Sequence, residues 1–252
     1  MIDVKTAARN RLLATLRAKD LEILLPGLSL HECTAGRILQ EAGTNVTHVW
    51  FPCDAAAASF VVAADDSHVV DTALIGSEGA IGGIVSNGRL PAFAQAHVQF
   101  GGSFLRMHLE TLSAAKSRSM TIANCFARYS DCLVAQLFQS AACNATHTIA
   151  QRLARWLLAT RDRTGRNDIA ITQEQLGEML GVGRSFINRS LRQFGSKGIL
   201  TSRRRRIAIV DLEGLRSIAC RCNDRIRQHF EEVLTGVYPN EAEFPIASKV
   251  QP

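Results

Sequence analysis

The chain has 252 residues, of which 46% are hydrophobic, so it can bury the core of one large or two modest domains. The formal net charge is +6, and the positive excess lies mainly toward the C-terminal half. No apolar run is long enough to span a membrane, and the N-terminal segment carries charges instead of an apolar signal core. We therefore expect a cytoplasmic protein with no membrane partner, whose basic end binds a polyanion.

The pattern of apolar residues changes from helical to strand-like near Leu28. Over Asn10–Leu25, leucines recur on or near one face, which predicts an amphipathic helix that ends at Pro26. From Leu28 to about Arg106, short runs rich in Val, Phe and Ile alternate with turn clusters, as is typical of a β-barrel or sandwich. Glycines that permit tight turns, and a close approach of the backbone to a ligand, gather before the last strands. They are Gly76, Gly79, Gly82, Gly83 and Gly88.

A long helical region follows, from His108 to about Ser140. One face is expected to pack on the β-domain, and the remaining apolar positions need a partner. A second copy of the chain in a two-fold helix pair would supply it, and so would another element of the same chain. The residues that we assign to dimerisation are Ile122, Phe126, Tyr129, Leu133 and Leu137. Further helices are predicted from Cys143 to Asp162 and from Leu212 to Leu234, the latter capping the preceding domain. A loose tail is expected from Tyr238 onward.

The stretch that begins at Thr172 carries the clearest signal. The Thr172 hydroxyl can cap a helix, and Gln175 completes the capping-box pattern. Apolar residues then follow at helical spacing until Gly181, a residue type that ends helices in the left-handed conformation. A second helix follows after a short turn, and its inward residues are expected to be Phe186, Ile187, Leu191 and Phe194. Two short helices joined by a tight turn predict a helix-turn-helix.

The other face of the second helix is basic and polar. It carries Arg184, Ser185, Asn188, Arg189 and Arg192. Two strand-like segments then flank the run Arg203–Arg206, which predicts a wing. No Asp or Glu occurs between residues 179 and 210, and cations without competing carboxylates suit the neutralisation of phosphates. These features together predict a DNA-binding domain; the alternative is a solvated basic face on an ordinary helical hairpin.

From about Asn10 to Cys222 the chain resembles the Crp/Fnr family of bacterial transcription regulators. The resemblance rests on ITQEQLGEMLGVGRSFINRSL (171–191), HTIAQRLARWLL (147–158) and IGSEGAIGG (75–83). It implies an α+β fold with an N-terminal β-roll (a cyclic-nucleotide-binding-like jelly roll), a long dimerisation helix and a C-terminal winged helix-turn-helix. We divide the chain accordingly into a β-roll sensor (1–112), a dimerisation helix (113–141), a DNA-binding domain (142–215), and a C-terminal helix and tail (216–252).

The resemblance also implies a function. Family members bind a pseudo-palindromic site in double-stranded DNA as homodimers, with a signal entering through the β-roll; we expect RNA polymerase as a further partner. The family's base-reading positions correspond to Arg184, Ser185 and Arg189, to which we add Asn188. The residues expected to contact DNA phosphates are Thr172, Gln173, Arg192, Arg203, Arg204, Arg205 and Arg206. Two departures are notable: Ser185 replaces the glutamate of many members, and Arg205 replaces a turn glycine, which predicts a looser hairpin.

The resemblance raises the question of a cyclic nucleotide. Members that bind one use a glutamate for the ribose and an arginine for the phosphate, and alignment by eye places Gly83 and Gln95 at these positions. A glutamine cannot neutralise a buried phosphate, so cyclic-nucleotide binding is not expected and no cofactor is predicted. The candidate effector pocket comprises Gly82, Gly83, Gln95 and Ala96. The sequence leaves open whether another small molecule, or none, acts there.

The seven cysteines do not form a disulfide framework in a chain of this length. Cys220 and Cys222 could ligate a metal or form a redox pair, but two thiolates do not close a zinc site, so structural cysteines are favoured and no metal is predicted. Cys33 and Cys53 do not reproduce the N-terminal cluster of iron–sulfur relatives. Among the histidines, His147 stands out because it precedes the DNA-binding domain.

Enzymatic activity has no support in the residues, because the chain contains neither a nucleophile elbow nor a phosphate-binding loop. Two alternatives to a DNA-binding regulator remain: a cyclic-nucleotide-responsive module that acts on a protein, and a sensor that works through thiols or a metal. The sequence does not specify the effector, the target promoters or their half-site, or the choice between activation and repression.

Overall fold

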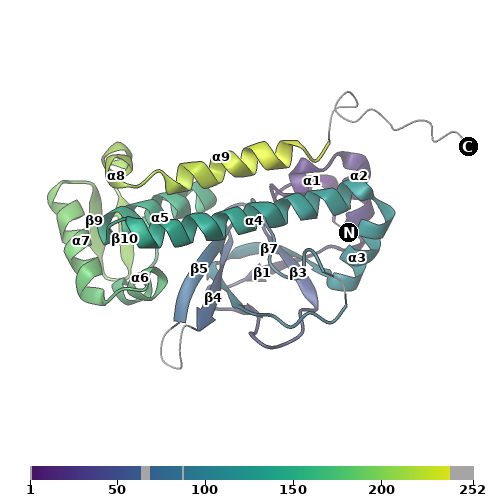
Figure 1. Cartoon of the computed structure of the whole chain (residues 1–252), viewed down its shortest axis with the longest axis horizontal. Helices are drawn as coiled ribbons and strands as arrows, with labels where there is room; N and C mark the ends of the chain where they lie inside the picture. Colours follow the sequence, from purple (N-terminus) through teal and green to yellow (C-terminus); the bar gives the residue numbers. More distant parts are fainter. Residues whose placement is uncertain (1, 64–68, 87, 239–252) are drawn as a thin grey trace, which may run out of the picture.

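The computed structural model describes residues 2–63, 69–86 and 88–238 (Figure 1). The expected turn at residues 64–67 and most of the expected loose tail lie outside these ranges. The β-roll, the long helix and a small helical domain follow one another along the chain; in space the long helix runs across the roll, and the helical domain lies at one end of the molecule (Figure 1). None of the described helices is long and apolar enough to cross a membrane.

The N-terminal segment corrects one expectation, because Asn10–Leu25 is not a single helix. The structure has α1 (Val4–Ala7), a 3-10 turn (Leu13–Thr15), α2 (Ala18–Leu24) and a second 3-10 turn (Leu25–Gly27). The buried side chain of Asn10 donates to the carbonyls of Pro52 and Gly79 and accepts from the N–H of Leu13. These bonds tie the segment to the β-roll, so the leucines are buried by a bent chain instead of one helix face.

The β-roll consists of two antiparallel sheets, as the alternation of short apolar runs and turns predicts. One sheet has the order β1 (Ser29–Cys33), β7 (Gly102–His108), β3 (His48–Pro52). The other has the order β2 (Ile38–Gln40), β6 (Gln95–Phe100), β4 (Ala57–Ala63), β5 (Val69–Ile75). The roll interior is apolar and includes Trp50, Ile75, Ile81, Val98 and Phe104.

The long helical region is divided at Ser119 into α3 (Leu109–Arg118) and α4 (Met120–Thr146). Ser119 has an extended backbone, and its hydroxyl caps α4 by accepting from the N–H of Ile122. The same hydroxyl donates to Asp20 at 2.8 Å, which fixes the break against the N-terminal segment. Helix α4 therefore starts later, and ends later, than the sequence predicts.

Part of the dimerisation assignment is corrected by the packing of α4. Ile122, Phe126 and Tyr129 are fully buried inside the chain, and the Tyr129 hydroxyl donates to the carbonyl of Ala80 at 3.0 Å. Side chains that pack in their own core offer no surface to a second copy. Leu133 is partly buried against the core, whereas Leu137 is 46% exposed and remains a candidate.

The C-terminal domain is built on α5 (Ile149–Thr164), which the Thr148–Gln151 capping box starts after a short break. The expected helix from Cys143 is thus wrong in its start, since α4 continues through that residue. The remaining elements are β8 (Asp168–Ile169), α6 (Gln173–Leu180), α7 (Arg184–Ser196), β9 (Leu200–Arg203), β10 (Arg206–Ile209) and α8 (Leu212–Ile218). The strands form one small sheet in the order β8-β10-β9.

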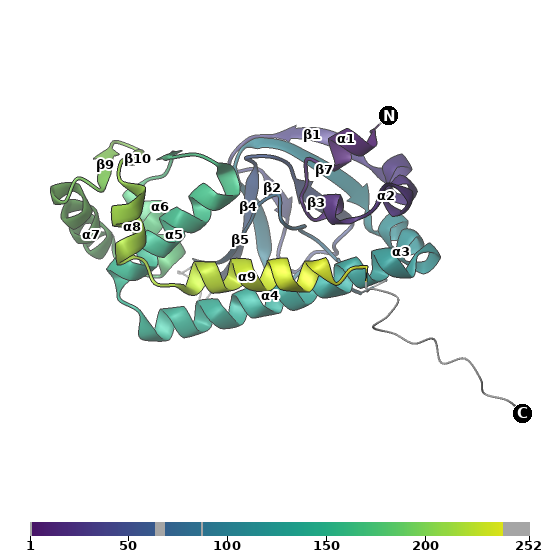
Figure 2. The same cartoon turned by 90° about the horizontal axis from the view of Figure 1, so that it is seen from above.

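The last helix, α9 (Cys222–Thr235), does not continue α8 but turns back along α4 (Figure 2). Phe230 packs edge-on against Tyr129 of α4, with ring centroids 6.3 Å apart. Arg128 of α4 donates to the carbonyl of Val233 at 2.9 Å. The expectation that one helix over Leu212–Leu234 caps the C-terminal domain is therefore wrong: α9 completes the core of the N-terminal half.

Candidate nucleic-acid interface

The helix-turn-helix forms as the sequence predicts. The N–H of Gln175 donates to the Thr172 hydroxyl at 3.1 Å, and the N–H of Thr172 donates to the Gln175 side chain at 2.9 Å, so both halves of the capping box are present. Gly181 ends α6 in the left-handed conformation, with φ 61°. A Cβ added at Gly177 would lie 2.7 Å from the carbonyl oxygen of Val182, so only glycine allows the two helices to approach this closely.

Helix α7 divides into a buried and an exposed face. Ile187, Leu191 and Phe194 are buried in the core of the C-terminal domain. The predicted DNA-contacting residues of this helix are exposed or, for Asn188, half-buried: they are Arg184, Ser185, Asn188, Arg189 and Arg192. Helix α7 lies at one end of the molecule (Figure 1), and its basic side chains are exposed there.

Phe186 departs from the predicted pattern, because its side chain is 46% exposed. The guanidinium of Arg189 lies over its ring, 5.8 Å from the centroid. Helical spacing brings residues three apart together, and the ring can hold a long side chain by a cation–π contact. Phe186 thus supports the orientation of Arg189 instead of filling the core.

A second arginine fixes the helix-turn-helix from behind. Arg152 on α5 donates to the carbonyl of Leu180, the last residue of α6. The C-terminal carbonyls of a helix have no partner within it, so a cationic donor stabilises this end. Leu153 and Leu157 of α5 pack into the same core as Leu176 and Ile187, so α5 is the scaffold that positions both helices.

The wing is a regular hairpin, and the predicted looser hairpin is not observed. Arg203 pairs with Arg206 across a two-residue turn. Arg205 adopts φ 62°, the conformation that a turn glycine would provide, so the hairpin closes without glycine at a local cost. All four arginines of the run are exposed. Arg206 also forms an ion pair with Asp168 on β8, so part of its positive charge is neutralised within the protein.

The candidate effector residues line neither of the two cavities that adjoin the C-terminal domain. Gly82 and Gly83 lie on a segment packed against His48, Leu90 and Leu109, where an added Cβ would collide. Gln95 donates to the carboxylate of Glu41 at 2.9 Å, a neighbour that repels an anion. Ala96 is fully buried in the apolar interior of the roll.

An ion pair with little solvent exposure lies at the border between the roll and the C-terminal domain. Glu78 accepts from Arg163 of α5 at 2.8 Å and from the N–H of Gly76 at 3.1 Å. Burial acts to raise the pKa of Glu78, but Arg163 and the Gly76 N–H outweigh it and hold the pKa below its usual value. A cavity of about 790 Å³ adjoins this pair and is also lined by Arg11 and Phe230. The sequence does not identify this pair, because no local pattern links Glu78 to Arg163.

The structure also places two residues beside Cys220 and Cys222 that the sequence analysis did not connect with them. Cys143 and His147 lie with both thiols at the junction of α4 and α9, and their ligand atoms are all within 4.8 Å of one another. The signal in the sequence was the four-residue spacing of Cys143 and His147, which puts them one helical turn apart. It was missed because these residues stand more than 70 positions from the other two.

Comparison with known proteins agrees with the geometry of the C-terminal domain. The family model of a Crp-like helix-turn-helix domain matches residues 151–218, which span α5 to α8. The chain carries a Crp-like helix-turn-helix domain. No curated protein sequence matches the chain.

Solved structures are similar to this chain over the β-roll and the long helix as well as the C-terminal domain. FixK2 from Bradyrhizobium japonicum superposes with a TM-score of 0.65 at 16% identity, covering 77% of this chain and 98% of that one. The c-di-GMP-responsive global regulator CLP of Xanthomonas campestris gives 0.63 at 13%, covering 77% and 100%. A CRP-family transcriptional regulator from Thermus thermophilus gives 0.61 at 14%, covering 75% and 95%. The protein thus has the Crp/Fnr regulator fold, and the predicted α+β class and β-roll architecture are confirmed.

Proposed function

We propose that this protein is a sequence-specific DNA-binding transcription regulator that acts as a homodimer on a pseudo-palindromic site. The observation that carries the proposal is the outward basic face of α7 on a capped, Crp-like helix-turn-helix. A helix of this kind fits the major groove, and its exposed arginines match the acceptors of guanine. No feature of the described residues favours an enzyme over this role.

The exposed residues of the domain divide into two roles. Arg184 and Arg189 are assigned to base edges, where a guanidinium can donate twice to guanine O6 and N7. The smaller side chains of Ser185 and Asn188 are assigned to contacts with neighbouring base edges. The residues assigned to phosphates surround this face: they are Thr172 and Gln173 at the start of α6, Arg192, and the wing run Arg203–Arg206. Phosphate contacts position the protein on the duplex, and base contacts select the sequence.

The proposed dimer uses the outward stripe of α4. Val134, Leu137 and Phe138 are 46%, 46% and 72% exposed, although they stand on one side of a long helix. Alanines at 141 and 145 continue this stripe at helical spacing and would let a second helix approach closely. A two-fold pair of α4 helices would place the two α7 helices about one DNA turn apart, roughly 34 Å.

Signal input is proposed to act at the border between the β-roll and the DNA-binding domain. Ala57, Leu74 and Phe100 of the roll belong to the same apolar core as Leu176 and Leu180 of α6. A change in the roll would therefore alter the support of the helix-turn-helix directly. Cyclic nucleotides are not proposed as the signal, because the Gln95–Glu41 contact offers no cation to a phosphate. RNA polymerase is proposed as a partner of the DNA-bound dimer.

The experiment is selection from a pool of randomised duplexes, followed by affinity measurements on the enriched site. An enriched inverted repeat is expected with the wild type and with the control Arg118→Ala, which removes an exposed charge from α3. No enrichment is expected with the double variant Arg184→Ala/Arg189→Ala. Enrichment of the same repeat by the double variant would contradict the assignment of α7.

The effector assignment has its own test. Selections repeated with cyclic AMP and with cyclic GMP are expected to enrich the same site with the same strength as without them. A site that appears only with one of these nucleotides would show that the β-roll binds it despite Gly83 and Gln95.

A second candidate function, a sensor acting through thiols or a metal, is favoured by the cluster at the α4–α9 junction.

A further inference from the structure

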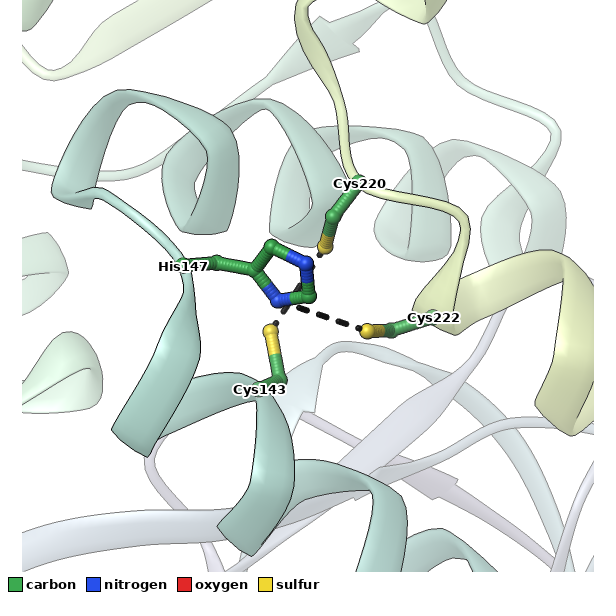
Figure 3. Close-up of side chains that lie close together, drawn as sticks. All are labelled: Cys143, His147, Cys220 and Cys222. Atoms are coloured by element: carbon green, nitrogen blue, oxygen red, sulfur yellow. Dashed lines mark hydrogen bonds between the residues drawn. The ribbon is translucent and has the colours of Figure 1, made fainter.

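Four side chains with metal-binding atoms converge where α4 ends and α9 begins (Figure 3). They are Cys143, His147, Cys220 and Cys222. The three cysteines are buried and His147 is half-buried. Among the described residues, the three thiols form a cluster of their own, separate from the cores of both halves of the molecule. The other four cysteines, by contrast, belong to the apolar cores of the roll and the N-terminal half.

The backbone brings two of these residues from each of two segments. Cys143 lies in the last turn of α4, and the N–H of His147 donates to its carbonyl at 3.1 Å, so the helical turn sets both side chains on one side. Cys220 and Cys222 flank Arg221 at the start of α9. Figure 3 shows the three sulfurs and the imidazole ring pointing toward one another from these segments.

All four ligand atoms lie within 4.8 Å of one another, and two of the distances between them match ligands around one ion. The sulfurs of Cys143 and Cys220 are 3.6 Å apart, and the Cys222 sulfur is 3.7 Å from Nδ1 of His147. A tetrahedral zinc ion with Zn–S bonds of about 2.3 Å and a Zn–N bond of about 2.0 Å holds its ligand atoms roughly 3.5–3.8 Å from one another. A disulfide would need its sulfurs about 2.05 Å apart, and a cluster of several irons would spread its ligands more widely.

We infer that Cys143, His147, Cys220 and Cys222 form a closed structural zinc site of the Cys₃His type. Three thiolates and one imidazole are a donor set that suits zinc, and four protein ligands leave no open position for catalysis. Binding of Zn²⁺ to the three thiols releases three protons, and the site keeps one net negative charge. The inference does not depend on DNA binding.

The surroundings of the cluster fit a metal-bound thiolate set. Gln139 on α4 donates from Nε2 to the Cys222 sulfur at 3.2 Å. Cys222 is the first residue of α9, where unpaired backbone N–H groups favour negative charge. Arg155 of α5 carries a positive charge near the Cys143 sulfur. Arg155 is therefore placed to balance the negative charge of the zinc-bound site.

The site lies where the DNA-binding domain is connected to the long helices. It joins the break between α4 and α5 to the break between α8 and α9. Helices α5 and α8 belong to the DNA-binding domain, whereas α4 and α9 form the paired helices beside the roll. A bound zinc ion would fasten the DNA-binding domain to the long helices at two points, and its loss would free both connections.

The test uses the full chain, purified under reducing conditions, stripped of metal and titrated with Zn²⁺ and with Co²⁺. One ion per chain is expected, and the cobalt form should show the visible spectrum of a tetrahedral site with thiolate-to-metal charge transfer. Cys222→Ala is expected to weaken Zn²⁺ binding by at least about 100-fold. The matched control, Cys132→Ala, removes a buried cysteine of α4 that lies outside the cluster and should retain full binding.

A conservative variant separates ligation from folding. His147→Cys is expected to bind one Co²⁺ with a spectrum shifted toward that of four thiolates, which a variant that merely disturbs the fold would not give. The inference is overturned if the reduced wild type takes up no stoichiometric Zn²⁺, or if Cys222→Ala binds it as tightly as the control. A chain that never binds metal and instead forms a Cys143–Cys220 disulfide on oxidation, seen as a loss of two hydrogens by mass, would also overturn it.

Discussion

The DNA-binding domain and the β-roll use their polar side chains in opposite ways. On α7, arginines are exposed opposite an inner face that is apolar apart from Ser190. In the roll, the positions expected to hold a nucleotide are glycines, a glutamine paired with Glu41, and a buried alanine. The carboxylates Asp71 and Glu78 lie instead where the roll meets α5 and α6. The face of α7 that is expected to contact DNA thus carries the cations that a polyanion needs, whereas the expected effector positions carry none.

The largest expected effect tests whether the helix-turn-helix depends on the close approach at Gly177. Gly177→Val would place a branched side chain against the Val182 carbonyl, and we expect it to lower the free energy of unfolding by about 3 kcal/mol. Gly195→Ala is the control, because its Cβ would lie 3.8 Å from the nearest atom and alanine favours helices. Urea denaturation measures both. Equal stability of the two variants would mean that the turn is not tightly packed.

A substitution of Asp71 tests whether the buried charge of its carboxylate, at the border of the roll, destabilises the folded protein. Burial raises the pKa of Asp71 to about 6, against a smaller opposing effect of the nearby Ser59 and Ala73. The folded state thus keeps its proton where the unfolded chain has lost it, and stability falls as pH rises from about 4 to 6. Asp71→Asn is expected to stabilise the protein by about 3 kcal/mol at pH 7 and hardly at all at pH 4. Denaturation curves at both pH values check this, and a gain of equal size at both would refute the cause.

The next effect concerns the exposed stripe of α4. Phe138→Glu would place charges in the proposed dimer interface, and we expect the dimer to weaken by about 2 kcal/mol, roughly 30-fold in Kd. Phe93→Glu is the control, because Phe93 is an even more exposed phenylalanine, at 86%, on the roll. Sedimentation at several concentrations distinguishes them. A dimer that Phe138→Glu leaves intact would place the interface elsewhere.

The smallest effect is at the wing. Arg205→Gly would relieve the positive φ and is expected to stabilise the protein by about 1 kcal/mol. Arg204→Gly removes the same charge from a residue without positive φ, so it should bring no stabilisation. Thermal unfolding of the two variants gives the difference. Both should weaken DNA binding slightly and without regard to sequence.

The sequence predicts the helix-turn-helix well because its signals are local. The Thr172–Gln175 capping box and Gly181 lie within one helical turn of the backbone groups that they contact. Ile187 and Leu191 are likewise one turn apart on the buried face of α7. The packing partners of the longer elements are harder to predict from the sequence. Apolar residues such as Phe126 and Tyr129 mark a buried helix face, but the spacing does not say whether a second chain or α9 covers it.

The candidate sites differ in the same way. The exposed face of α7 follows from helical periodicity, whereas the Cys₃His cluster needs α9 to fold back along α4, which no local pattern encodes. The Glu78–Arg163 pair likewise joins residues 85 positions apart. The assignment of Ile122 to dimerisation failed for this reason: its partner is the chain's own core.

The central claim, that α7 reads bases while the wing holds phosphates, is tested most directly by salt titrations of DNA affinity. Arg189→Ala and Arg204→Ala are compared with the wild type on the selected repeat and on a scrambled duplex. Arg189→Ala should lose about 1–3 kcal/mol on the repeat and much less on the scrambled duplex. Arg204→Ala should weaken both alike and lower the salt slope by about 1. Equal losses of specific and non-specific binding in both variants would contradict the account.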